Sequence, residues 1–171
     1  MEANQNRVSA ELGLGSAAGN AEQYLTFMLN EEEYGVDILR VQEIKGWSST
    51  TKIPNTPDYI RGVMNLRGAI VPIIDLRSRF EMPAIEYTAT TVVIVLKIHT
   101  DSAERTVGFV VDAVSDVYNV AQDQYRPAPD FGSHVDTAFI RALATVEEKM
   151  VILLDIDRLL NIDEVTSAVT H

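Results

Sequence analysis

Apolar and polar residues alternate along this chain in short runs, which is the pattern of β-strands that bury one face. Residues 61–77 read RGVMNLRGAIVPIIDLR, two apolar runs joined at Arg67-Gly68. Both runs are rich in β-branched residues, so they predict two strands with a tight hairpin turn between them. Gly68 can take a positive φ at no steric cost, which leaves the Arg67 guanidinium free at the tip. Pro72 donates no hydrogen bond to a neighbouring strand, so it predicts a sheet edge or a bulge at that point.

Further strands follow from the same alternation. Residues 24–29 (YLTFML) and 34–38 predict a hairpin, and residues 31–33 (EEE) predict its charged, solvated turn. Residues 91–98 (TVVIVLKI) carry few charges and predict a buried central strand. Residues 106–117 predict one long strand that returns beside it.

The segment after the first hairpin admits two structures. Asp37 is a suitable cap for a short helix that would place Ile38, Val41 and Ile44 at i, i+3 and i+6. A continuing strand fits the same residues almost as well. In both structures Glu43 lies beside this apolar ridge, so an acidic side chain is expected next to apolar ones there.

The pattern occurs twice in the chain. The window 59–76 returns at 139–156 with a constant spacing of 80 residues, and upstream of it Gly35 matches Gly108 at a spacing of 73. We therefore predict a duplicated unit of about sixty residues. Because a lone unit of that size buries only ~60% of its unfolded surface, the two copies are expected to pack against each other. Gly108 itself predicts a bulge or a strong bend in its strand.

Short strands at regular spacing, with only minor helices between them, predict an all-β fold. We expect two SH3-like β-barrel lobes of about five strands each, formed by the internal duplication. Lobe 1 is expected at about residues 24–80 and lobe 2 at about 91–160. Residues 1–20 are polar and small, so they predict a disordered leader, and residues 166–171 predict a frayed tail. The ordered domain is thus expected at residues 21–165.

Composition excludes several classes of function. The chain has 171 residues with 14 Lys+Arg against 25 Asp+Glu, a net charge of -11, which argues against nucleic-acid binding. It has no cysteine, so disulfides, thiolate metal sites and thiol nucleophiles are absent. The start MEANQNRVSA lacks an apolar signal core, and the apolar runs are too short to span a bilayer. An intracellular protein without direct membrane insertion is expected.

Candidate catalytic chemistry is sparse. His99, His134 and His171 fall in a turn, a loop and the last position, without the spacing of metal ligands. Asp155 and Asp157 have the spacing of a cation-binding pair, but they stand where a strand meets a helix, and capping explains them without a ligand. Phosphate-loop, dinucleotide and nucleophile-elbow motifs do not occur. We therefore expect no enzyme, no catalytic residue, no metal and no cofactor.

A binding module is the class of function that remains, and its charged residues indicate one region for binding. Glu43 and Arg67 lie in the same copy of the repeat. We expect an ion pair between them that fixes the loop around the apolar ridge.

The stretches EEYGVDILRVQEIKGW and KIPNTPDYIRGVMNLRGAIVPIIDLR, followed by TVVIVL, GFVVDAVSDV and RPAP, closely resemble the CheW family of bacterial chemotaxis coupling proteins. The resemblance covers roughly residues 22–165. It implies two SH3-like barrel lobes, no catalysis, no cofactor, and a scaffold that links methyl-accepting chemotaxis receptors to the histidine kinase CheA. It also implies a cytoplasmic protein that is recruited to membrane receptor arrays.

Members of this family pair barrel to barrel with the regulatory domain of CheA and take the cytoplasmic tip of the receptor in the groove between the lobes. Carried over by position, the resemblance implies that the partner-binding region contains Ile38, Val41, Glu43, Ile44, Gly62 and Arg67. Two other functions stay open. A small enzyme in the inter-lobe cleft would need clustered groups with perturbed pKa values, and a regulatory ligand-binding module would need an enclosed apolar pocket of ~300 Å³ or more.

Overall fold

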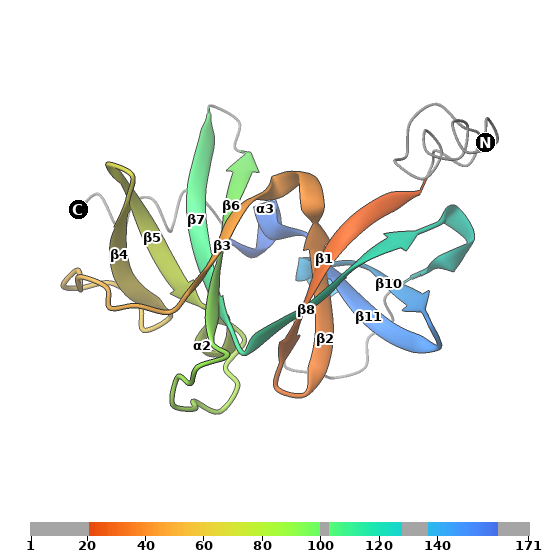
Figure 1. Cartoon of the computed structure of the whole chain (residues 1–171), viewed down its shortest axis with the longest axis horizontal. Helices are drawn as coiled ribbons and strands as arrows, with labels where there is room; N and C mark the ends of the chain where they lie inside the picture. The colour runs from red at the N-terminus through yellow and green to blue at the C-terminus, as the bar shows by residue number, and fades with distance from the viewer. Residues whose placement is uncertain (1–20, 100–102, 128–136, 161–171) are drawn as a thin grey trace.

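The computed structural model describes residues 21–99, 103–127 and 137–160. The strands form two sheets, each the framework of one lobe (Figure 1). The six-stranded lobe contains β1 (Glu22–Leu29), β2 (Glu32–Asp37), β8 (Ala113–Val120), β9 (Tyr125–Arg126), β10 (Ile140–Val146) and β11 (Lys149–Leu154), in the order β8-β1-β2-β11-β10-β9. The five-stranded lobe contains β3 (Val41–Gly46), β4 (Ile60–Leu66), β5 (Ala69–Asp75), β6 (Val92–His99) and β7 (Glu104–Val111), in the order β3-β6-β7-β5-β4.

Helices are short and join the strands. They are the 3-10 turns η2 (Ile38–Arg40), η3 (Gln122–Gln124) and η4 (Thr137–Phe139) and the one-turn α-helices α2 (Leu76–Arg79) and α3 (Ile156–Leu159). The prediction of an all-β fold with two lobes and minor helices is confirmed. In the described part of the chain, no helix has the length and apolar character needed to cross a membrane. The predicted disordered leader and frayed tail lie outside the described residues.

The duplication is confirmed in the strands themselves. β4 and β10 begin and end 80 residues apart, as do α2 and α3. The backbone N–H of Asp75 donates to Tyr59 O (2.8 Å), and the N–H of Asp155 donates to Phe139 O (2.9 Å). Both aspartates also cap the following helix, as predicted for Asp155, because their side chains accept from the N–H three residues on. Equivalent residues therefore make equivalent hydrogen bonds in both copies.

The lobes are not contiguous in sequence, so the predicted boundaries, 24–80 and 91–160, are wrong. β1 and β2 of the first repeat lie in the sheet of β8 to β11, whereas β6 and β7 of the second repeat lie in the sheet of β3 to β5. The reason is two equivalent parallel pairings, β2 with β11 and β5 with β7. The repeats thus exchange their first hairpins.

This exchange also divides the strand expected at residues 106–117. β7 and β8 are separate strands on either side of Asp112, and they belong to different lobes. The alternating pattern runs through both strands, so it does not reveal the change of sheet.

Gly35 and Gly108 occupy the same place in the two parallel pairings. Gly108 lies opposite Ile73, and Gly35 opposite Leu153. A Cβ atom on Gly108 would lie 2.8 Å from Ile73 Cδ1, and one on Gly35 would lie 3.0 Å from Leu153 Cδ2. The bulge predicted at Gly108 is wrong, since β7 pairs with β6 without a register shift. The glycine instead makes room for the side chain of the neighbouring strand.

Pro72 lies in β5, between β4 and β7. β5 pairs with β7 only from Ile73 to Asp75, so the strand up to Pro72 is an edge on that side. The predicted edge is confirmed for this half of β5, where a missing N–H leaves no pairing partner unsatisfied.

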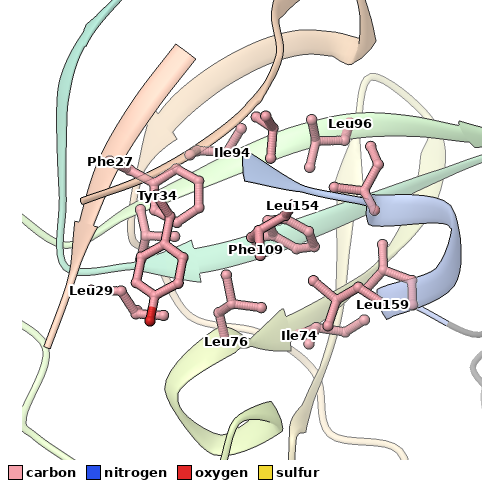
Figure 2. Packing of buried hydrophobic residues seen from close by; sticks show 14 of the residues in the cluster. Phe27, Leu29, Tyr34, Ile74, Leu76, Ile94, Leu96, Phe109, Leu154 and Leu159 are labelled. Atoms are coloured by element: carbon pink, nitrogen blue, oxygen red, sulfur yellow. The ribbon is translucent and has the colours of Figure 1, made fainter. Parts of the chain in front are cut away.

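The main hydrophobic core lies between the two lobes. Figure 2 shows side chains from β1, β2, β6, β7, β11 and both α-helices packed together, among them Phe27, Tyr34, Leu96, Phe109 and Leu154. Each lobe has a smaller core of its own, around Leu153 in the six-stranded lobe and Ile73 in the five-stranded lobe. The expectation that the two copies pack against each other is therefore confirmed.

Arg79 adds a polar link at this junction. Its guanidinium lies 5.1 Å from the ring centre of Tyr59 and 4.9 Å from that of Phe139, which are equivalent residues of the two repeats. Its Nη2 also donates to Leu159 O at the end of α3 (3.1 Å). Cation–π contacts contribute about 0.5–1 kcal/mol each at partly exposed sites. Arg79 thus helps to hold the lobes in a fixed relation.

Candidate docking surface

The six residues predicted for partner binding all lie between β2 and β5 in the sequence, on η2 and on strands and a turn of the five-stranded lobe. Ile38 begins η2, Val41, Glu43 and Ile44 lie on β3, Gly62 lies on β4, and Arg67 lies in the β4–β5 turn. We call the exposed residues of η2, β3 and the β4–β5 hairpin the candidate docking surface.

The segment from Asp37 to Ile44 combines the two structures that its sequence allows. The Leu39 N–H donates to Asp37 Oδ1 (2.9 Å), which caps the single turn η2. The chain then continues as β3. This strand has a bulge, because Val41 pairs with Leu96 while Glu43 already pairs with Val95.

The bulge decides which way each side chain points. One extra residue shifts the alternation, so Val41 and Ile44 lie on the same face of β3. That face is shared with their partners Leu96 and Ile94, which belong to the core between the lobes. Glu43 lies on the opposite face, toward the core of the five-stranded lobe. The apolar ridge and the acid therefore border different cores.

Arg67 reaches Glu43 across the open side of the sheet. Arg67 has a φ of 53° and Gly68 one of 88°, and Asn65 Oδ1 accepts from the Gly68 N–H (2.8 Å), which fixes the turn. Arg67 Nη2 lies 2.9 Å from Glu43 Oε1. The predicted ion pair is confirmed. The Arg67 side chain stays 81% exposed and that of Glu43 24%, so the guanidinium keeps a free surface for a partner.

Gly62 has a structural task in this surface. It is buried, has a φ of +129°, and its Cα faces the backbone of Thr51, which pairs with Val63. This pairing carries the segment that leaves β3 over to β4, the opposite edge of the sheet. Gly62 therefore has a structural role, because the absence of a side chain lets the Thr51 backbone pack closely against β4.

Two exposed apolar residues near these positions were not predicted. Leu39 in η2 is 86% exposed and Ile70 in β5 is 61% exposed, beside Ile44 at 42%. The alternation of the run IVPII was the available signal for Ile70, because its neighbours Val71 and Ile73 point inward. Scattered exposed apolar residues are ordinary, but these three belong to η2, β3 and the β4–β5 hairpin, which carry the predicted binding residues.

The second repeat keeps the apolar part of this surface and changes its charge. Val117 and Met150 stand at the positions of Ile44 and Ile70, and both are exposed. Asp116 and Glu147 stand at the positions of Glu43 and Arg67. Two acids cannot form the ion pair of the first repeat, so the two lobes present chemically different surfaces.

η2 is tied to the other lobe by Asp157 of α3. Arg40 Nη1 and Nη2 donate to the two carboxylate oxygens of Asp157 (2.9 and 2.7 Å), and the His99 N–H donates to Oδ1 (2.9 Å). The hydrogen bonds from Arg40, followed by the backbone N–H of His99, outweigh burial and hold the pKa of Asp157 below its ordinary value. Asp157 is thus a structural ion-pair partner of Arg40.

The lowered pKa predicts a pH-dependent contribution to stability. A carboxyl group whose pKa is lower when folded contributes stability above its unfolded pKa of ~3.9 and loses it as pH falls. Asp157→Asn is therefore expected to lower the free energy of unfolding by about 1 kcal/mol at pH 7 and by much less below pH ~3. Urea unfolding across this range measures it, with the exposed Asp123→Asn as control. A difference that stays constant with pH would contradict the role given to this ion pair.

A small, charged pocket lies in the six-stranded lobe, beside η2 and α3. It encloses about 230 Å³ and is lined by Asp37, Arg40, Arg141, Asp155 and Asp157 together with Leu154 and Ile156. The groups in it whose pKa is shifted are partners in ion pairs, such as Arg40 with Asp157 and Arg141 with Glu22. Within the described residues, no group of three or more metal-ligating side chains is arranged to hold a metal ion. This pocket is therefore neither an enclosed apolar pocket nor a cluster of unpaired acids and bases.

Comparisons with known proteins agree on one family. The model of the CheW-like domain matches residues 23–164. A "Chemotaxis protein CheW" of Klebsiella aerogenes is 50% identical over 143 residues, covering 84% of both chains, and one of Bacillus subtilis is 33% identical over 149 residues, covering 86% of this chain and 92% of the relative. Among solved structures, the scaffolding protein TtCheW of Thermoanaerobacter tengcongensis matches with a TM-score of 0.76 and 34% identity, over 84% of this chain and 95% of that one.

Proposed function

The chain belongs to the CheW-like domain family, and on this basis we propose that it couples methyl-accepting chemotaxis receptors to the histidine kinase CheA. It is a chemotaxis adaptor, a scaffold and not an enzyme, as the family and the named relatives indicate. Receptors and a kinase are the partners that such a scaffold has in general.

In this proposal both partners bind around the candidate docking surface. The regulatory domain of CheA pairs barrel to barrel with a lobe, and the cytoplasmic tip of the receptor binds along the groove bordered by Ile38, Val41 and Ile44. The protein works in the cytoplasm and is recruited to membrane receptor arrays by these contacts. Exposed apolar side chains with a charged group beside them suit an interface of standard size, ~800 Å² per partner.

The observation that carries this assignment is the Arg67 side chain. It is fixed by Glu43 at 2.9 Å and yet remains 81% exposed, on the β4–β5 hairpin that also carries the exposed Ile70. A positioned arginine with a free face is a typical anchor for a protein interface, because little conformational entropy is lost when it binds. The alternatives, a small enzyme or a regulatory ligand-binding module, are not favoured, since the pocket beside η2 and α3 is small and its charged groups are paired.

Co-sedimentation tests the coupling directly. The protein is mixed with receptor-containing membranes and CheA, and both pelleting and kinase activity are measured. We expect the protein to pellet with receptors and to bring CheA and receptor control of its activity with it, and membranes without receptors serve as control. A chain restricted to residues 21–165, the proposed functional unit, is expected to behave like the whole protein. Failure of the whole protein to associate with either partner would refute the proposal.

A further inference from the structure

The six-stranded lobe has an open cavity at the end that carries its β1–β2 and β10–β11 turns. β2 and β11 are parallel neighbours, with Tyr34 opposite Ile152, so both strands begin at the same end of the sheet (Figure 1). The cavity at this end has a volume of about 500 Å³. Its apolar walls come from Met28 and Leu143 as well as from Met150 and Ile152.

Three successive glutamates line the other side of this cavity. The sequence predicts a solvated turn for residues 31–33, but only Glu31 and Glu32 are exposed. Glu33 is just 9% exposed, and the prediction is wrong for this residue. Glu33 is part of β2 and pairs with Met28 of β1, so it belongs to the sheet and not to the turn.

The carboxylate of Glu33 is only partly satisfied. Its Oε1 lies 3.2 Å from Lys149 Nζ, while its Oε2 is buried and has no hydrogen-bond partner. Lys149 Nζ also donates to the Tyr118 hydroxyl (2.9 Å), so one ammonium group serves two acceptors. A buried carboxylate normally accepts hydrogen bonds at both oxygens, so Glu33 has capacity for a further donor.

The charge and the shape of the cavity together determine which ligand it can bind. Three glutamates and one lysine line the cavity, which leaves an excess of negative charge there, although Glu32 Oε1 accepts from the Tyr34 hydroxyl (3.2 Å). The Lys149 side chain is 48% exposed, so its ammonium group can move into water and leave Glu33 to an incoming cation. The two methionines, Met28 and Met150, are flexible side chains that suit the aliphatic stem of a bound residue.

We propose that this cavity binds an arginine or lysine side chain of a protein partner, presented by a segment with apolar residues on either side. The cation replaces Lys149 at Glu33, and its apolar neighbours contact Met28 and Met150. Arginine fits best, because its planar guanidinium donates two parallel hydrogen bonds to one carboxylate. This site lies in the other lobe from the candidate docking surface and does not depend on the function proposed above.

Methionine methyl groups report on this site directly. The protein is labelled with ¹³C-methyl methionine and titrated with the peptide acetyl-Leu-Arg-Leu-amide. The Met28 and Met150 signals are expected to shift, whereas those of Met64 and Met82, which are buried elsewhere, stay in place. Peptides with glutamate or norleucine in place of arginine are expected to bind at least roughly tenfold more weakly, since each lacks the charge-assisted hydrogen bonds.

Variants distinguish the effect of the Glu33 carboxylate on binding from the effect of the protein's overall negative charge. Glu33→Gln is expected to weaken binding roughly tenfold, and Lys149→Met to strengthen it severalfold by removing the competing cation. The exposed Glu86→Gln serves as the matched control and is expected to change nothing. If Glu33→Gln does not fold, Lys149→Met and the exposed Glu31→Gln decide the matter. Equal shifts with the norleucine peptide, or an affinity that Lys149→Met leaves unchanged, would overturn the proposal.

Discussion

Replacing Arg67 by glutamate is expected to leave the protein folded and to weaken its binding to receptor or kinase roughly thirtyfold, a loss of about 2 kcal/mol. The effect on folding is small because the pair with Glu43 lies at the surface, where ion pairs contribute only ~0–1 kcal/mol. The effect on binding is larger because a partner that covers the turn removes water from the guanidinium. A desolvated arginine then depends on its partner groups, and a glutamate in its place adds repulsion.

The same surface allows a charge-swap control. Glu43→Arg alone is expected to weaken binding similarly, and the double variant Glu43→Arg with Arg67→Glu is expected to recover part of the loss if the pair positions the turn. Arg105→Glu, an exposed arginine on β7, is the matched control for net charge. Calorimetric titration with each partner measures affinity, and circular dichroism monitors the fold. Wild-type affinity of Arg67→Glu for both partners would exclude Arg67 from the interface.

Strands and the repeat could be predicted from sequence because both depend on local alternation. The partner of each strand could not, since β2 shows the same pattern of buried and exposed residues whether it lies beside β11 or beside another strand. The matched glycines were the available signal. Gly35 and Gly108 are needed where a parallel neighbour from the other repeat approaches closely, which is a reason for their shared position that composition alone does not reveal.

The candidate docking surface was predictable to a similar degree. A spacing of three between Ile38, Val41 and Ile44 suggests a helix, but the chain places Val41 and Ile44 on one face by means of a bulge. Bulges depend on the neighbouring strand and leave no clear mark in the sequence. Leu39 was missed for a related reason, because its exposure depends on where the single turn η2 ends.

Gly62→Ala is expected to lower the free energy of unfolding by about 3 kcal/mol or more. A Cβ atom at this position would lie 2.2 Å from Thr51 O and 2.8 Å from Thr51 C, and these are backbone atoms that cannot rotate away. Relief requires the Thr51 segment to move, which breaks its two hydrogen bonds with Val63 (2.9 Å each), at about 1 kcal/mol apiece. The φ of +129° adds strain of about 1–3 kcal/mol for any residue with a side chain.

Urea unfolding followed by the fluorescence of Trp47, the single tryptophan, measures this loss. Gly46→Ala is the matched control, because nothing lies within 4 Å of its added Cβ, and its stability is expected within about 0.5 kcal/mol of the wild type. Partner binding is measured where the variant is still folded. Because Gly62 is buried, its loss is expected to act on binding through the moved Thr51 segment and to spare surfaces of the six-stranded lobe. Wild-type stability combined with lost binding would instead mean that the partner itself contacts Gly62.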